Sequence, residues 1–241
     1  MDIIIITGGS KGIGKALAKK YASENYTVFS LARSSSDLKN IQNITVDLSN
    51  LHETETIFTT LLKKIISQEI KSITLVNNAG RLGEISNLEN LEADDISKSI
   101  QLNTTTPLIL SNLFIKLTKT LTCKKQIINI SSGAAKSPYQ GWVVYCTSKA
   151  AIDMMTKAIA TEQFEIKNGV KCVAIYPGVV DTNMQNKIRN CTEADFKSLQ
   201  RFVDLKVNNE LYTPNFVAET VYNIDTKNQL QSGDIVDIRN F

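Results

Sequence analysis

The chain has 241 residues, of which 42% are hydrophobic and 21% charged, which is the composition of an ordinary globular protein long enough to bury a core. Its formal net charge is +3, with no run rich in Lys or Arg, and this argues against a nucleic acid partner. No apolar stretch approaches the roughly 20 residues of a membrane span, and the run after Met1 is too short for a signal peptide.

Short β-branched runs alternate with longer amphipathic segments along the whole chain. The pattern predicts strands at 2–7, 27–32, 43–48, 72–80, 126–131, 170–178 and 234–238, and helices at 13–23, 53–67, 96–120 and 145–163. The strands are apolar almost throughout, as in a parallel sheet covered on both faces. We therefore predict one α/β domain over residues 1–241, with a doubly wound, seven-stranded parallel sheet and helices on both faces.

The segment TGGSKGIGKA, after the first strand, has glycines at positions 8, 12 and 14 and opens a helix. Backbone N–H groups and the helix dipole there favour an anion, such as the pyrophosphate of a dinucleotide. The string from Gly9 to Lys15 also satisfies most of the P-loop pattern, but Ala16 stands where that pattern needs a magnesium-binding hydroxyl. The position after the first strand favours a dinucleotide site over a purely structural turn.

The second strand ends in Arg33 and Ser34, where an NAD-preferring site has an acidic residue for the ribose 2′-hydroxyl. Lys11 adds a cation in the glycine loop. An arginine fork binds phosphate well, so these residues favour NADPH over NADH. The alternative is a solvated arginine in a polar loop.

Tyr145 and Lys149 are four residues apart in a predicted helix and therefore share one face. Most such pairs are solvated surface. The more specific interpretation is a proton donor beside a cation, and the residues alone leave both open.

Cysteine and histidine usage argues against a metal site. The four cysteines (Cys123, Cys146, Cys172, Cys191) lie far apart, and His52 is the single histidine. Zinc needs more closely spaced ligands, and nothing around His52 suggests a Ser-His-Asp triad. Separate thiols are expected in a reducing compartment, so we expect a cytoplasmic protein without a metal.

Several motifs occur in order: TGGSKGIG at 7–14, NNAG at 77–80, Asn103, ISS at 130–132, YCTSK at 145–149 and PGVVDT at 177–182. With these motifs the chain resembles the short-chain dehydrogenase/reductase superfamily over essentially its full length. The resemblance implies a single-domain Rossmann fold and catalytic residues Asn103, Ser132, Tyr145 and Lys149. It implies NADP(H) contacts from Gly8, Ser10, Lys11, Gly12, Ile13, Gly14, Arg33, Ser34, Asp47, Leu48, Asn77, Ala79, Gly80, Tyr145, Lys149, Pro177, Gly178, Val180 and Thr182.

The chemistry of carbonyl reduction explains these catalytic residue types. Hydride transfer leaves an alkoxide that needs a proton, and a free tyrosine, with a pKa of roughly 10, is a poor donor partner at neutral pH. We expect the Lys149 ammonium to lower the pKa of Tyr145, the general acid. The Ser132 hydroxyl can donate to the carbonyl oxygen. The resemblance implies that Asn103 holds a water molecule that links Lys149 to solvent.

The second half resembles the subgroup of sepiapterin reductases and (S)-benzoin-forming benzil reductases. The markers are Gly141-Trp142, Cys146, DTNMQ at 181–185, the segment 193–206 and PNFVA at 214–218. The implied substrate residues are Ser132, Trp142, Tyr145, Met184, Gln185 and Asp237.

Two of these substrate residues have competing interpretations. Trp142, with Met184, would form a flat, polarizable wall for a conjugated ketone, although Trp142 could equally be a core aromatic. Asp237 would grip the guanidine-like edge of a pterin. It could instead be a carboxylate at a strand end, paired with Arg239.

Together the residues and the resemblance predict an NADPH-dependent carbonyl reductase acting on a small conjugated ketone or α-diketone, benzil-like or sepiapterin-like. The alternative is a non-catalytic NADP(H)-binding sensor or interaction module of the same fold. The presence of all four catalytic residues argues for the enzyme. The resemblance also implies a homodimer, or a homotetramer, formed through the helices at 96–120 and 145–163.

Overall fold

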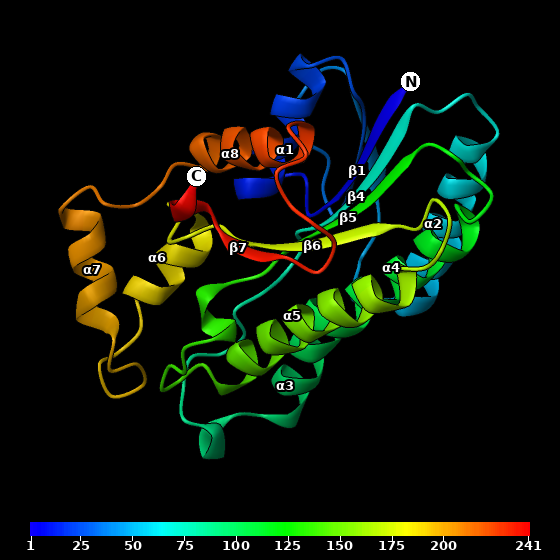
Figure 1. The fold of residues 1–241 in the computed structure, drawn as a ribbon. Helices are drawn as coiled ribbons and strands as arrows, with labels where there is room; N and C mark the ends of the chain where they lie inside the picture. The colour runs from blue at the N-terminus through cyan, green and yellow to red at the C-terminus, as the bar shows by residue number, and fades with distance from the viewer.

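The computed structural model describes residues 1–241, whose strands form one parallel sheet (Figure 1). The strand order is β3-β2-β1-β4-β5-β6-β7, so the chain winds outward in one direction from β1 and in the other from β4. This confirms the predicted doubly wound sheet. The strands are β1 (Asp2–Thr7), β2 (Thr27–Ala32), β3 (Ile41–Thr45), β4 (Ser72–Asn77), β5 (Lys124–Ile130), β6 (Lys171–Tyr176) and β7 (Ile235–Asp237).

Both faces of the sheet are covered by helices, which explains why most of the strands are largely apolar. Ile3 and Ile5 of β1 point into a core shared with α2 (Leu51–Ile66), α4 (Thr106–Leu117) and α5 (Val143–Gln163). Ile4 and Ile6 point into a second core with α1 (Gly12–Ser23) and α8 (Pro214–Thr226), which lie together in Figure 1. None of the helices combines the length and apolar character that a membrane crossing requires.

The helix predicted at 96–120 is instead three consecutive segments. They are α3 (Ala93–Ile100), a π-helical turn (Gln101–Thr105) and α4. Pro107 lies in the first turn of α4 and has no N–H with which to continue the preceding hydrogen-bond ladder. The wider turn carries Asn103, and π-helical turns are frequent at functional sites.

Three helices were not among those predicted, and they all follow β6. They are α6 (Asn183–Arg189), α7 (Leu199–Val207) and α8. Figure 1 shows α6 and α7 beyond the carboxyl end of β6, away from both covered faces of the sheet. The start of α8 did have a local signal, because Thr213 caps it by accepting a hydrogen bond from Phe216 N at 3.2 Å and Pro214 follows. β3 begins two residues earlier than the predicted strand at 43–48.

Candidate active site

The loops at the carboxyl ends of the strands bring the predicted site residues together. A Cβ atom on Gly80, after β4, would lie 3.3 Å from Asn103 Oδ1 and 3.9 Å from Lys149 Nζ. A Cβ atom on Gly12, in the loop after β1, would lie 3.5 Å from Thr182 Cγ2. The glycine loop, the segment after β6 and the predicted catalytic residues therefore border one region of the protein, at the sheet edge where this class of fold binds ligands.

The tyrosine-lysine pair is buried, which excludes the solvated-surface interpretation. Tyr145 is 9% exposed and Lys149 is 6% exposed. Lys149 Nζ donates to Ile130 O at 2.8 Å, so the end of β5 holds the ammonium in place. The ammonium lies 5.8 Å from the centroid of the Tyr145 ring. Ser132, two residues after Ile130, lies close enough to the Tyr145 hydroxyl to affect its pKa.

Burial shifts both groups towards their neutral forms. It raises the pKa of Tyr145 to about 12, against the opposing effect of the nearby Ser132 hydroxyl. It lowers the pKa of Lys149 to about 8, against the opposing charge of Asp153. The expectation that the pKa of Tyr145 lies below its ordinary value is therefore wrong for this structure. Withdrawal of the phenolate from water is the largest effect, and the ammonium hydrogen-bonds a backbone carbonyl rather than the phenol.

Asn103 is 1% exposed and its amide makes three hydrogen bonds to protein groups. Its Oδ1 accepts from Arg81 N at 2.8 Å, and its Nδ2 donates to Arg81 O at 2.8 Å and to Ser148 Oγ at 3.1 Å. The π-helical turn thus ties the loop after β4 to the catalytic helix α5. The water-holding role of Asn103 stays a prediction.

The glycine loop has the geometry that a bound pyrophosphate needs. A Cβ atom on Gly14 would lie 2.3 Å from Gly8 O, so this close approach requires glycine. Lys11 precedes α1 without a side-chain cap, and the first turn contains no acidic residue. The first N–H groups and the dipole of α1 therefore remain available to an anion. The residues present fit a dinucleotide.

The predicted 2′-phosphate residues lie on exposed loops that contact one another. Arg33 and Ser34 follow β2, and Ser34 Oγ donates to Ser10 Oγ of the glycine loop at 3.3 Å. Hydrogen bonds from Ser49 lower the pKa of Asp47, and the charge of Arg33 adds to that effect. Arg33 is therefore close to the predicted adenine-binding residues as well as to the glycine loop.

Other predicted cofactor residues have side chains that are packed within the protein. Asn77 is 5% exposed, and its Nδ2 donates to Asn129 Oδ1 at 2.9 Å. Leu48 is buried, and its carbonyl accepts from Thr106 Oγ1 at 2.7 Å. The remaining predicted residues at this edge are Ile13, Ala79, Pro177, Gly178 and Val180. The cofactor contacts of this whole set stay predictions.

Three contacts that the sequence reasoning missed hold these loops together. Asn78 Nδ2 donates to Thr7 O at 2.8 Å, and Thr7 Oγ1 accepts from the backbone N–H of Ala79 at 3.0 Å. Tyr212 packs against Gly178, where a Cβ atom would lie 2.7 Å from the ring. Thr7 and Asn78 lie inside the sequence motifs, but nothing local to Tyr212 marks it.

Trp142 is enclosed by aromatic rings, as its core interpretation requires. It stacks on Phe196 with centroids 4.6 Å apart and an interplanar angle of 12°, and it meets the Tyr145 ring edge-on at 5.7 Å. Tyr139 and Phe202 complete this aromatic cluster (Tyr139, Trp142, Tyr145, Phe196, Phe202). The cluster holds the Tyr145 ring in place and packs the segment between α6 and α7 against the loop before α5.

The other predicted substrate residues have different surroundings. Met184 packs partly buried against the aromatic cluster. Gln185 is 2% exposed, and neither polar atom of its amide has a partner. Asp237 accepts from Arg239 Nε at 2.8 Å and from Nη2 at 2.5 Å, which is the pairing that the sequence offered as an alternative. That carboxylate already holds a guanidinium.

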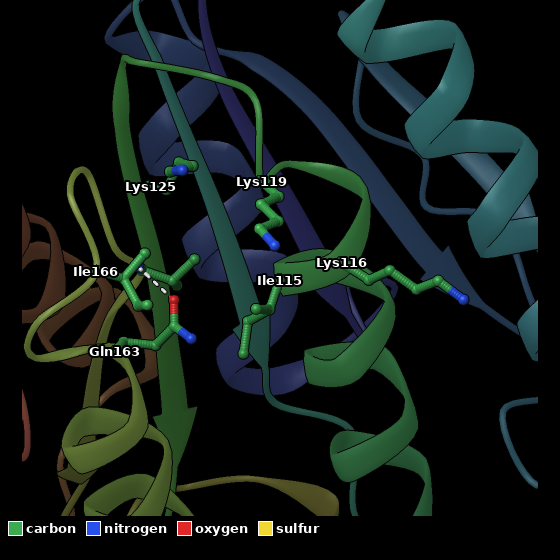
Figure 2. Close-up of a pocket in the computed structure, with 7 residues that line it drawn as sticks. Ile115, Lys116, Lys119, Lys125, Gln163 and Ile166 are labelled. Carbon is green, nitrogen blue, oxygen red and sulfur yellow. Dashed lines mark hydrogen bonds between the residues drawn. The ribbon is translucent and has the colours of Figure 1, made fainter.

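Two pockets lie outside the catalytic group. One, of about 200 Å³, lies near the amino end of β5 and the carboxyl ends of α4 and α5, and Figure 2 shows Gln163 bonded to the backbone there. It contains none of the predicted site residues. Its lining is Ile115, Lys116, Lys119, Lys125, Gln163, Ile166 and Val170. The other, of about 410 Å³, borders Gly12 and the first turns of α1.

Comparison with known proteins agrees with this geometry. The short chain dehydrogenase family matches residues 2–193. The chain belongs to that family. It is 40% identical to a benzil reductase ((S)-benzoin forming) of Bacillus subtilis, covering 100% of both chains. It is 29% identical to a sepiapterin reductase of Meriones unguiculatus, covering 98% of this chain and 95% of the relative.

Solved structures show the same fold. A short chain dehydrogenase/reductase from Saccharomyces cerevisiae superposes with a TM-score of 0.84 at 24% identity, covering 99% of this chain and 96% of the other. The protein is thus an oxidoreductase of the short-chain family, which uses a nicotinamide cofactor. The predicted subgroup of benzil and sepiapterin reductases is confirmed by the relatives.

Proposed function

We propose that this protein is an NADPH-dependent carbonyl reductase that acts on a conjugated ketone or α-diketone, with Tyr145 as the general acid. The observation that carries the proposal is the buried Tyr145 side chain, with Ser132 close to its hydroxyl and the Lys149 ammonium 5.8 Å from its ring centroid. A pKa of about 12 keeps this phenol protonated at neutral pH, as a proton donor must be. The likeness to a benzil reductase at 40% identity supports the same reaction class.

In the proposed reaction, Ser132, Tyr145 and Lys149 each have a separate role. A bound reduced nicotinamide would supply the hydride that forms the new C–H bond as the carbonyl π bond breaks. Ser132 donates a hydrogen bond to the carbonyl oxygen, where negative charge develops. Tyr145 gives its proton to that oxygen and forms the alcohol. The Lys149 ammonium, 5.8 Å from the ring centroid, offsets part of the cost of burying the phenolate that remains.

Preference for NADPH is the part of the proposal that rests on Lys11, Arg33 and Ser34. These side chains offer two cations and a hydroxyl near the glycine loop, with no carboxylate directly after β2. A guanidinium binds a phosphate through two parallel hydrogen bonds, whereas an NAD-preferring site needs an acidic acceptor there.

An aromatic α-diketone fits the substrate residues better than a pterin does. Arg239 presents a guanidinium to Asp237 through two hydrogen bonds, the same kind of contact that the edge of a pterin would make. A pterin would have to displace it. The aromatic cluster beside Tyr145 supplies apolar surface for a conjugated ketone.

The test is NADPH oxidation in the presence of benzil, 1-phenyl-1,2-propanedione and sepiapterin, measured in parallel. We expect fast turnover of the diketones and slow turnover of sepiapterin. Fast sepiapterin turnover that Asp237→Asn abolishes would assign the protein to pterin chemistry instead. Tight NADPH binding without turnover of any of the three would favour the non-catalytic sensor.

We also propose that the protein is a cytoplasmic homodimer, with a homotetramer as the other assembly of this kind. Helices α4 and α5 carry the exposed apolar side chains Leu108 and Met154, and Phe164 follows α5 with 86% exposure. Light scattering coupled to size exclusion chromatography measures the assembly. The four cysteines are all unpaired, as in a reducing compartment.

A further inference from the structure

Asp153 lies on α5 one turn beyond Lys149 and receives hydrogen bonds from two strand ends. Its Oδ1 accepts from Ser131 Oγ at 2.6 Å, and its Oδ2 accepts from the Tyr176 hydroxyl. Ser131 is adjacent to Ser132, and Tyr176 immediately precedes the Pro177-Gly178 turn. One carboxylate therefore joins the catalytic helix to the ends of β5 and β6.

We propose that Asp153 is a positioning residue that holds Ser132 and Lys149 in register and keeps Lys149 in its cationic form. This inference rests on the proposed function, because it concerns the group that supports Tyr145. The carboxylate makes no ion pair with Lys149, whose Nζ hydrogen-bonds Ile130 O. It acts through space and through the backbone at residues 130–132, where Ser131 Oγ also lies 3.5 Å from Lys149 O.

Among the charged and titratable groups around Lys149, Asp153 is the negative charge that favours the ammonium. Within α5, Tyr145 is a neutral phenol near the ammonium. From β6, Tyr176 donates to Asp153, and burial raises the pKa of its phenol well above the ordinary value. Lys136 lies over the Tyr176 ring at 5.3 Å, and Asp237 is engaged by Arg239. On the β4 side, Asn103 and Gly80 are uncharged.

The sign of the effect follows from proton binding in the two states. Unfolded Lys149 keeps its proton up to a pKa of about 10.4, whereas the folded protein releases it near pH 8. Between these values the unfolded chain binds more protons, so the contribution of Lys149 to stability rises with pH. Without the charge of Asp153, the pKa of Lys149 falls further and this rise begins at lower pH.

The first experiment needs no turnover. The free energy of unfolding is measured from pH 6 to 10.5 for the wild type, Lys149→Met, Asp153→Asn and the double variant. The difference that Lys149 makes is then compared with and without the carboxylate, so that the general cost of losing Asp153 cancels. We expect the onset of the rise to move down by about half a pH unit or more in the Asp153→Asn background.

The second experiment measures kcat for diketone reduction against pH. The alkaline limb of Asp153→Asn should move down in pH by the same amount, because Lys149 must stay charged. Tyr176→Phe is the matched control, since it removes one hydrogen bond but keeps the carboxylate, and its limb should coincide with that of the wild type. Unchanged onset and limb in Asp153→Asn would overturn the proposal, whatever stability is lost. A wild type silent on carbonyl substrates would instead reject the proposed function, and the unfolding comparison would still decide the role of Asp153.

Discussion

Two clusters in this chain, each with a buried tyrosine, are built from the same three side-chain types, yet they differ in how their contacts are made. In the first cluster (Tyr21, Lys124, Asp225), the Tyr21 hydroxyl donates to Asp225 Oδ2 at 2.8 Å and Lys124 Nζ donates to Oδ1 at 2.7 Å. The tyrosine and the lysine both donate hydrogen bonds to the carboxylate, and the cluster connects α1, α8 and the start of β5.

In the second cluster (Tyr145, Lys149, Asp153), the three groups do not bond one another. The carboxylate is held by Ser131 and Tyr176, and the ammonium is held by a backbone carbonyl. The tyrosine hydroxyl and lysine ammonium thus keep donor capacity for a ligand. Burial raises the pKa of both Tyr21 and Tyr145, so a shifted pKa alone does not distinguish the two clusters. Their hydrogen-bond geometry does.

The largest expected effect separates the clusters by activity. Tyr145→Phe should lower kcat about 10²- to 10⁴-fold, because only the transferable proton is lost. Unfolding free energy and NADPH affinity should stay close to those of the wild type, since the ring still packs in the aromatic cluster. Stopped-flow turnover and a fluorescence titration with NADPH measure the two quantities. Retention of more than a tenth of the wild-type kcat would reject Tyr145 as the acid.

The next effect separates the clusters by stability. Asp225→Asn should lower the free energy of unfolding by about 2 kcal/mol, because a buried carboxylate loses its charge-assisted bonds. Lys124 is 39% exposed, so water compensates part of the loss. Chemical denaturation gives this value. The kcat per folded molecule should not change, and a collapse of kcat at full occupancy of the folded state would contradict the structural role.

Local sequence patterns predicted the sheet and its glycine loop, which is the first of two levels of organisation in this molecule. Apolar runs and Gly8, Gly12 and Gly14 carry that information within a few neighbouring residues. The catalytic residues came from the family resemblance, and the structure brings Ser132, Tyr145 and Lys149 together.

The second level depends on contacts between distant segments and was not predicted. Phe196 belongs to the aromatic cluster only because the chain between α6 and α7 folds back onto Trp142. Asp153 and Asp225 look alike in sequence, and only their distant partners distinguish them. The pKa of Tyr145 was predicted in the wrong direction, because sequence gave the neighbouring charge but not the burial.

A smaller effect is expected at the cofactor end of the molecule. Arg33→Ala should weaken NADPH binding about tenfold, or about 1.4 kcal/mol, while NADH affinity hardly changes. Lys39→Ala is the matched control, because it removes one exposed cation from the same loop without touching the predicted phosphate site. Equal losses for both cofactors in Arg33→Ala, or an equal loss of NADPH affinity in Lys39→Ala, would contradict the assignment.

The smallest expected effect comes from the variant that compares Tyr21 directly with Tyr145. Tyr21→Phe deletes the same atom as Tyr145→Phe, but it should lower the free energy of unfolding by about 1 kcal/mol and leave kcat unchanged. The loss stays small because Lys124 still pairs with Asp225. Denaturation midpoints and diketone kcat, measured for both variants side by side, should give opposite patterns. If Tyr145→Phe lost stability and Tyr21→Phe lost activity, the proposed rule would be wrong. Hydrogen bonds among the three side chains would then not distinguish a structural cluster from a catalytic one.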